Sequence, residues 1–282
     1  MKINLNDHNL SQLEKTEIEN LLTKAMLRPN TELQQIWQLM DLVWDEYDCD
    51  NKKLNLNNID KFYYHPVWLL NGLFIEQHAL SMQHRNAISN WISNKASISK
   101  ILDYGGGFGT LARLIVDKNP SLLVDIYELH PSDYAKQRIT EYRQIRFIND
   151  IHAKYDVLVS TDVLEHVPDP LKTFGDMILS VKDNGYLIIA NNFFPRIKCH
   201  LPRTFHLRYT FNLFAKFMGL VIICPLEESH ATIFKKNSDK PVNWSAIRLI
   251  EIISKGIFPM IEFLNPILRP VFKLIKHEHP SS

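Results

Sequence analysis

The middle of the chain alternates between short apolar runs and segments with the 3.6-residue period of amphipathic helices. Such alternation is typical of a doubly wound α/β sheet. The last two runs follow one another without a helix, so we expect them to form an antiparallel hairpin at the sheet edge. The pattern predicts strands at 99–104, 122–128, 145–148, 155–160, 186–190, 220–224 and 230–234, and helices at 109–118, 132–143, 171–181 and 210–218.

The first 95 residues predict helices rather than strands. Scattered leucines in 1–30 indicate a short amphipathic helix that ends near Pro29, and Thr31 is a candidate N-cap for a second helix. A further helix is predicted over 69–92. The aromatic stretch 62–68 before it is either the core of a helical cap or a lid over a ligand, with Tyr63, Tyr64 or His65 facing that ligand, and the two interpretations are compatible.

The C-terminal part, 244–277, has apolar residues throughout, and its polar positions fall roughly on one helical face. Three prolines, at 259, 266 and 270, predict that it is cut into short helices. Two interpretations remain open for this appendage. It packs on the domain or on a second subunit, or it makes an interfacial contact with a membrane.

These patterns divide the chain into three parts: a helical N-terminal cap or lid (1–95), a ligand-binding α/β domain (96–238) and C-terminal amphipathic helices (239–282). The 282 residues are 45% hydrophobic. With 32 Lys and Arg against 31 Asp and Glu the net charge is +1, so the chain as a whole has no strong positive potential that would attract nucleic acid. Three cysteines without C-x-x-C spacing, and no apolar signal core, predict a cytoplasmic protein. Peripheral contact with the inner face of the membrane is the alternative.

A glycine-rich segment follows the first predicted strand. The strand ends at Asp103, the glycines lie within 105–109, and a helical pattern follows, which together indicate a strand, a tight turn and a helix N-terminus. The dinucleotide fingerprint G-x-G-x-x-G would require glycine at position 110, where this chain has Thr110. A nicotinamide oxidoreductase is therefore disfavoured.

The pattern Asp103-x-Gly105-x-Gly107-x-Gly109 resembles motif I of the class I S-adenosylmethionine (SAM) methyltransferases. The segment 160–170, Ser-Thr-Asp-Val-Leu-Glu-His-Val-Pro-Asp-Pro, closely resembles the stretch after strand four in the branch that includes ubiquinone-pathway and many small-molecule methyltransferases. The resemblance covers about 98–236. It implies a Rossmann-like, seven-stranded doubly wound α/β sheet, here with an N-terminal helical cap and a C-terminal helical appendage.

The resemblance also implies the cofactor, SAM, and its product S-adenosylhomocysteine. The glycine loop would cradle the methionine part, Glu128 would bind both ribose hydroxyls, and Asp150 with Ile151 would contact adenine. A carboxylate suits the ribose because its two oxygens can accept from two hydroxyls. The residues expected to bind the cofactor are Asp103, Tyr104, Gly105, Gly107, Gly109, Glu128, Leu129, Asp150, Ile151, Thr161 and Asp162.

Methyl transfer from sulfur is an in-line displacement, for which the protein supplies alignment and dry surroundings. An alcohol or phenol acceptor also needs a base, and histidine is the usual candidate. We expect this base to be His166, in the matched segment, or His206, which matches a histidine of many relatives. No metal ligands are assigned: the calcium-like Asp48-x-Asp50 lacks the glycine and glutamate of such a loop.

The sequence thus favours a SAM-dependent methyltransferase that acts on an oxygen of a small molecule or of a sugar or glycan. One alternative is a membrane-associated lipid or quinone methyltransferase, held by its C-terminal helices. Another is a non-catalytic SAM-fold interaction module, and the C-terminal helices are also candidates for dimerisation. Nucleic acid is not expected as a substrate, because no basic stripe with interleaved aromatics is present.

Overall fold

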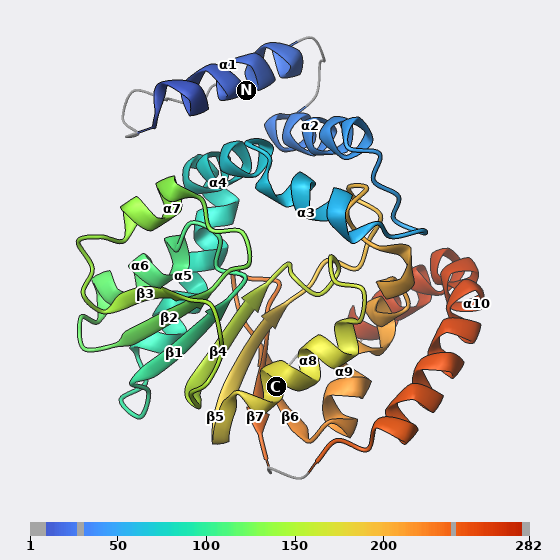
Figure 1. Ribbon diagram of the computed structural model, residues 1–282. Helices are drawn as coiled ribbons and strands as arrows, with labels where there is room; N and C mark the ends of the chain where they lie inside the picture. Colours follow the sequence, from blue (N-terminus) through green and yellow to red (C-terminus); the bar gives the residue numbers. More distant parts are fainter. Residues whose placement is uncertain (1–9, 27–30, 238–240, 278–282) are drawn as a thin grey trace.

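The computed structural model describes residues 10–26, 31–237 and 241–277, with side chains for 10–24, 31–237 and 241–265. Seven strands form one sheet in the order β3-β2-β1-β4-β5-β7-β6; β7 pairs antiparallel with both β5 and β6, and the other pairs are parallel (Figure 1). This confirms the predicted doubly wound sheet and its edge hairpin. The strands are β1 Lys100–Tyr104, β2 Leu123–Tyr127, β3 Ile145–Ile148, β4 Tyr155–Thr161, β5 Val181–Ala190, β6 Leu220–Pro225 and β7 Thr232–Lys236.

The sheet is buried on both faces because successive side chains of a strand point in opposite directions. Ile101 and Val157 contribute to one apolar cluster, whereas their neighbours Leu102 and Leu158 contribute to the other. Helices α5 (Ala79–Ser93) and α6 (Thr110–Lys118) complete the first cluster. Helices α8 (Pro170–Leu179) and α9 (Leu207–Phe217) complete the second. The two apolar layers pack against both faces of the sheet and so hold the ends of its strands in place relative to one another.

Four further helices form the N-terminal cap: α1 (Gln12–Met26), α2 (Glu32–Glu46), α3 (Leu56–Tyr64) and α4 (Val67–Gln77). They share an apolar core with residues such as Ile36, Phe62 and Leu70, and they lie across one end of the sheet (Figure 1). The Thr31 cap is confirmed, since Thr31 and Gln34 form a capping box. Pro29 lies outside the described residues.

Some predicted boundaries were wrong. The helix expected over 69–92 is two helices, because the backbone at His78 is extended. The helix expected over 132–143 covers only α7, Asp133–Arg138. The strand expected at 186–190 begins five residues earlier, because β5 continues through Asn184, which has a positive φ of 60° where the pairing with β4 is irregular.

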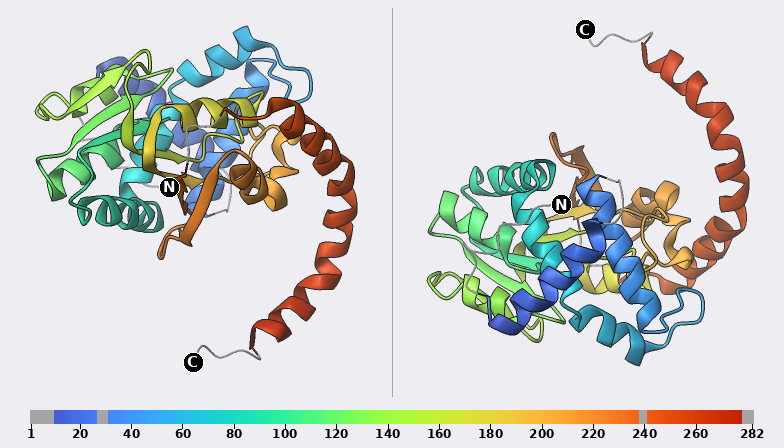
Figure 2. Two further views of the ribbon diagram at one scale, coloured as in Figure 1. Left: turned by 90° about the horizontal axis from the view of Figure 1, so that it is seen from below. Right: turned by 90° about the horizontal axis from the view of Figure 1, so that it is seen from above.

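The C-terminal segment is a single helix, α10 (Trp244–His277), so the prediction of several short helices was wrong. Proline removes one helical hydrogen bond and bends a helix without necessarily ending it. Figure 2 shows the result, an arc that leaves the body of the molecule. Within the described residues, we find no helix with the length and apolar character that crossing a membrane requires.

Candidate active site

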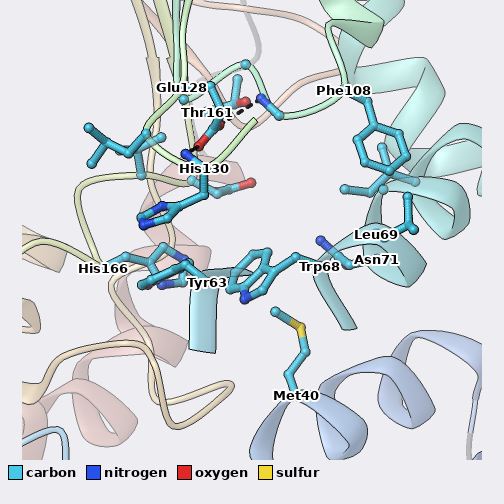
Figure 3. Close-up of a pocket in the computed structure, with 18 of the residues that line it drawn as sticks. Met40, Tyr63, Trp68, Leu69, Asn71, Phe108, Glu128, His130, Thr161 and His166 are labelled. Atoms are coloured by element: carbon cyan, nitrogen blue, oxygen red, sulfur yellow. Dashed lines mark hydrogen bonds between the residues drawn. The ribbon is translucent and has the colours of Figure 1, made fainter. Parts of the chain in front are cut away.

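A cavity of about 820 Å³ lies between the helical cap and the carboxyl ends of the parallel strands. This is the edge of a doubly wound sheet at which ligands bind, and the volume is that of a small-molecule site. One part of its wall, here called the cofactor side, comes from the loops after β1 and β2. The opposite part, here called the acceptor side, carries Met40, Tyr63, Trp68 and His166 (Figure 3).

The glycine loop after β1 uses a left-handed backbone. Gly105, Gly107 and Gly109 have φ values of 75°, 52° and 68°, a region in which a Cβ is strained. A Cβ added to Gly107 would meet nothing within 4 Å, whereas one added to Gly106 would lie 2.6 Å from Oδ2 of Asp103. Gly107 therefore faces open space at the pocket wall, and Gly106 is packed against the protein.

Glu128 follows β2 and closes the cofactor side. Its Oε2 accepts from the backbone N–H of Gly107 at 3.0 Å, and its Oε1 accepts from the backbone N–H of His130 at 3.2 Å (Figure 3). These two bonds hold the carboxylate at the pocket wall, and each oxygen retains capacity for another donor. A ribose diol is a ligand of matching chemistry.

Asp103, at the end of β1, is 2% exposed, and its Oδ2 has no hydrogen-bond partner among the described residues. Burial raises its pKa to about 7, and the nearby Arg85 partly opposes this effect. Both residues line the pocket. A cationic ligand group beside Asp103 would satisfy the buried oxygen. The cofactor side therefore fits SAM, which carries an ammonium group and a ribose diol.

Most of the residues predicted to bind the cofactor line the pocket, including Leu129, Thr161 and Asp162. Gly109, Asp150 and Ile151 do not. Gly109 is the left-handed N-cap of α6 and packs beneath the loop, near Ile126. Asp150 is exposed, so an adenine contact from Asp150 would need the ligand to extend beyond the cavity.

The two candidate bases lie in different surroundings. His206 is buried outside the pocket lining, and its Nδ1 lies 2.8 Å from Oγ of Ser254 on α10. The structure thus places His206 in the contact between α9 and α10 and not among the residues that line the cavity. His166 does line the pocket, between the rings of Tyr63, Trp68 and His200.

His166 belongs to a compact group with Glu165 and His200, here called the Glu-His-His cluster, whose candidate ligand atoms lie within 4.8 Å of one another. Burial lowers the pKa of His166 to about 3 and also lowers the pKa of His200. Burial and the neighbouring Asp162 raise the pKa of Glu165 well above its usual range. Both rings are therefore uncharged at neutral pH.

Several pocket residues were missed from the sequence. Trp68 lies in the aromatic stretch that was noted but not resolved residue by residue, and it packs between Phe62 and Tyr63. Phe62 belongs to the core of the cap, and Tyr63 lines the pocket, so the stretch contributes to both the cap core and the pocket wall. His130 could have been predicted as a pocket residue, because it lies two residues after Glu128. His200 gave no signal, because α8 and β5 separate it along the chain from the other two cluster residues.

Parts of the chain are similar in sequence to known methyltransferases. Residues 77–211 match the model of a family described as "Methyltransferase domain". Curated relatives include the ubiquinone biosynthesis O-methyltransferase of Acinetobacter baumannii (strain AYE), 31% identical over 115 residues that cover 36% of this chain and 48% of that protein. The enzyme of the same name from Haemophilus ducreyi is 27% identical over 139 residues, 45% of this chain and 58% of that protein. The chain spans about half the length of the curated relatives it matches.

Among solved structures, mitomycin 7-O-methyltransferase MmcR is similar with a TM-score of 0.48 and 14% identity, covering 80% of this chain and 68% of that one. An O-methyltransferase family protein from Burkholderia thailandensis has a TM-score of 0.45 and 16% identity, covering 62% of this chain and 61% of that one.

Proposed function

We propose that this chain, whose residues 77–211 match the model of a methyltransferase domain, transfers the methyl group of SAM to an oxygen atom of a small acceptor with a flat, apolar body. One observation carries the proposal. The pocket has a polar cofactor side at Gly107 and Glu128 and an aromatic acceptor side at Tyr63 and Trp68. A methyl donor and an apolar acceptor could therefore occupy one cavity face to face.

On the cofactor side, Glu128 would hold the ribose, and the open backbone at Gly107 would admit the methionine part. Asp103 would pair with the ammonium group. SAM supplies an activated methyl group when it is bound. The residues named here orient that group and exclude water, which strengthens the electrostatic contacts in the site.

On the acceptor side, ring contacts hold the lining residues in place. The centroids of Tyr63 and Trp68 are 5.0 Å apart, and Tyr63 stacks on His130 at 5.6 Å. Burial raises the pKa of Tyr63, so its phenol stays neutral. These rings offer flat apolar area with a few polar edges, which suits an aromatic or quinol-like acceptor better than a highly hydroxylated glycan.

The reaction forms a C–O bond to the acceptor and breaks the C–S bond of the sulfonium, so S-adenosylhomocysteine leaves as a neutral thioether. The hydroxyl proton must leave the acceptor as well. We assign His166 to this hydroxyl, because it is the candidate base that lines the cavity. His206 is not carried forward as a base.

The test is transfer of a labelled methyl group from SAM into fractionated cell extract, with Gly107→Val as the blank. We expect label in the low-molecular-weight organic fraction, released as methyl iodide by hydriodic acid, as O-methyl groups are. Label in protein or nucleic acid, or an N-methyl or C-methyl product, would contradict the proposal. Label in a polysaccharide fraction would support methyl transfer, but it would show that the acceptor is a glycan and not a small apolar molecule.

A second proposal concerns where the enzyme works, and α10 supports it. Its polar residues face the body: Arg248 pairs with Asp169 on the loop before α8, and Glu262 pairs with Arg208 on α9. Ile247 packs into the core, whereas most of the apolar side chains farther along face solvent, with Phe263 75% exposed. The others on this outer face are Leu249, Ile252, Ile253, Ile257 and Met260.

An exposed apolar stripe of this length marks a contact surface, and a basic amphipathic helix is typical of the membrane interface. The part of α10 beyond the described side chains contains Arg269, Lys273 and Lys276 and no acidic residue. We therefore propose peripheral contact with an anionic lipid surface. Co-sedimentation with phosphatidylglycerol vesicles should be lost in Ile253→Asp/Phe263→Asp. Failure of the wild type to sediment, with a dimer in solution, would assign the stripe to a second copy instead.

A further inference from the structure

We propose that Glu165, His166 and His200 form a binding site for a divalent transition-metal ion such as Zn²⁺ or Fe²⁺ at the acceptor side of the pocket. Ion binding stands on the geometry alone, whereas its role in catalysis rests on the proposed methyl transfer. Nothing in the chain's sequence motifs or in its relatives' names assigns an ion to these residues.

The three ligands come from two loops that meet over the sheet. Glu165 and His166 follow β4, and His200 lies in the loop between β5 and α9. The backbone joins these loops where the N–H of Leu201 donates to the carbonyl of Glu165 at 2.9 Å. The candidate ligand atoms lie within 4.8 Å of one another. Ligands of a tetrahedral ion are roughly 3.4 Å apart, so the widest pair would close by at most about 1.4 Å.

Each imidazole has the orientation of a metal ligand. Nδ1 of His166 lies 3.2 Å from the carbonyl oxygen of Cys199, and Nδ1 of His200 lies 2.6 Å from that of Phe194. A carbonyl only accepts, so Nδ1 carries the hydrogen in both rings and the lone pair is on Nε2. A metal-bound histidine nearly always donates its other ring N–H in this way.

Glu165 supplies an independent indication. Its side chain is fully buried, Oε1 accepts from the backbone N–H of Asn192 at 2.8 Å, and Oε2 has no hydrogen-bond partner in the described part of the chain. A buried carboxyl oxygen without a donor is costly. A cation held by this carboxylate and the two imidazoles would satisfy it. The neighbouring Asp162, which raises the pKa of Glu165, lies 3.0 Å from Nε2 of His230.

The donor set decides the class of ion. Two imidazoles and one carboxylate suit Zn²⁺, Fe²⁺ or Co²⁺ and not the all-oxygen sites of Mg²⁺ or Ca²⁺. Three protein ligands leave at least one position open, as in catalytic sites. All three residues line the cavity, so this position faces the acceptor.

An ion here would bind the acceptor oxygen and lower the pKa of its hydroxyl, as bound metals do for water. The proton would pass to water in the pocket, and the resulting oxygen anion would attack the methyl group. His166 would then act as a ligand, and direct proton transfer to its ring would not be needed. An acceptor with two neighbouring hydroxyls could occupy two open positions.

The first experiment titrates metal-free full-length protein with Co²⁺ and records its visible absorption. We expect 1:1 binding with the bands of a four- or five-coordinate ion. Glu165→Gln and His200→Gln should each weaken Co²⁺ binding more than tenfold, since loss of an outer partner alone costs about 10–100-fold. His152→Gln, at an exposed histidine outside the pocket, is the matched control. Circular dichroism and SAM titration verify that each variant is folded.

The outcomes separate the two proposals. Absence of Co²⁺ and Zn²⁺ binding in protein that still binds SAM would overturn the ion site and leave the methyltransferase proposal standing. Equal Co²⁺ affinity in wild type, Glu165→Gln and His200→Gln would overturn the assignment of ligands. If the ion binds as expected, chelation should lower methyl transfer by more than tenfold, with recovery on adding Zn²⁺ or Fe²⁺. Unchanged turnover after chelation would overturn the catalytic role.

Discussion

Oε2 of Glu128 lies 3.0 Å from the backbone nitrogen of Gly107, and this hydrogen bond joins the loops after two neighbouring strands. The same carboxylate lines the pocket. Glu128 therefore contributes in two ways: its carboxylate holds the glycine loop in place, and its oxygens are exposed to a ligand in the pocket. Loss of its carboxylate should affect SAM more than it affects the fold.

We expect Glu128→Ala to weaken SAM binding by roughly 10–100-fold, since hydrogen bonds to a charged group contribute about 1.5–3 kcal/mol. Isothermal titration calorimetry measures this. Asp150→Ala is the informative partner variant, because the family resemblance predicts an adenine contact and the structure places Asp150 outside the cavity lining. Equal losses of SAM affinity in both variants would support the predicted contact between Asp150 and adenine. Unchanged SAM affinity in Glu128→Ala would refute the role of Glu128 in binding the ribose.

The two central glycines should respond differently to substitution. Gly107→Val should abolish SAM binding, because its side chain would occupy open space at the pocket wall and its φ of 52° disfavours a Cβ. Gly106→Ala should instead lower thermal stability, because its Cβ would lie 2.6 Å from Asp103. Thermal melts together with SAM titrations separate the two effects. Normal SAM affinity in folded Gly107→Val would contradict this placement of the cofactor.

Asp103 should make stability depend on pH. Its folded-state pKa of about 7 lies above the unfolded value, so the folded state holds its proton more tightly between about pH 4 and 7. This contribution is present at low pH and is lost as pH rises through that window. Relative to wild type, Asp103→Asn should therefore gain unfolding free energy from pH 4 to 7, by up to about 4 kcal/mol. Urea melts without SAM measure this, and parallel pH profiles would contradict it.

The two candidate bases should separate kinetically. His206→Gln should leave SAM affinity and turnover within about twofold and lower stability by about 1 kcal/mol, because a hydrogen bond to Ser254 is lost. His166→Gln should reduce turnover strongly with SAM affinity retained. Single-turnover assays with labelled SAM distinguish these results. A large kinetic defect in His206→Gln alone would reverse the assignment.

The sheet and the cofactor side could be predicted because their signals are local. The apolar strands, the glycine spacing from Asp103 and the acid Glu128 each follow from a few neighbouring residues. The first four strands lie within one residue of their predicted bounds, whereas β5 begins five residues before its predicted start. The helix N-cap at Thr31 could be predicted for the same reason, because its capping box involves only Thr31 and Gln34.

The acceptor side could not be predicted in this way, because it is assembled from distant segments. Trp68 comes from the cap, His166 from the loop after β4 and His200 from the loop after β5, and only tertiary packing brings them together. The continuity of α10 was missed for a related reason. Its contacts with Asp169 and Arg208 accompany a helix that proline bends but does not end.

SAM titration of the purified chain, followed by calorimetry, tests the central claim most directly. The account predicts one site per chain, with binding lost in Gly107→Val, weakened in Glu128→Ala and retained in His152→Gln. Absence of binding by the wild type at millimolar SAM, or undiminished binding by Gly107→Val and Glu128→Ala, would contradict it.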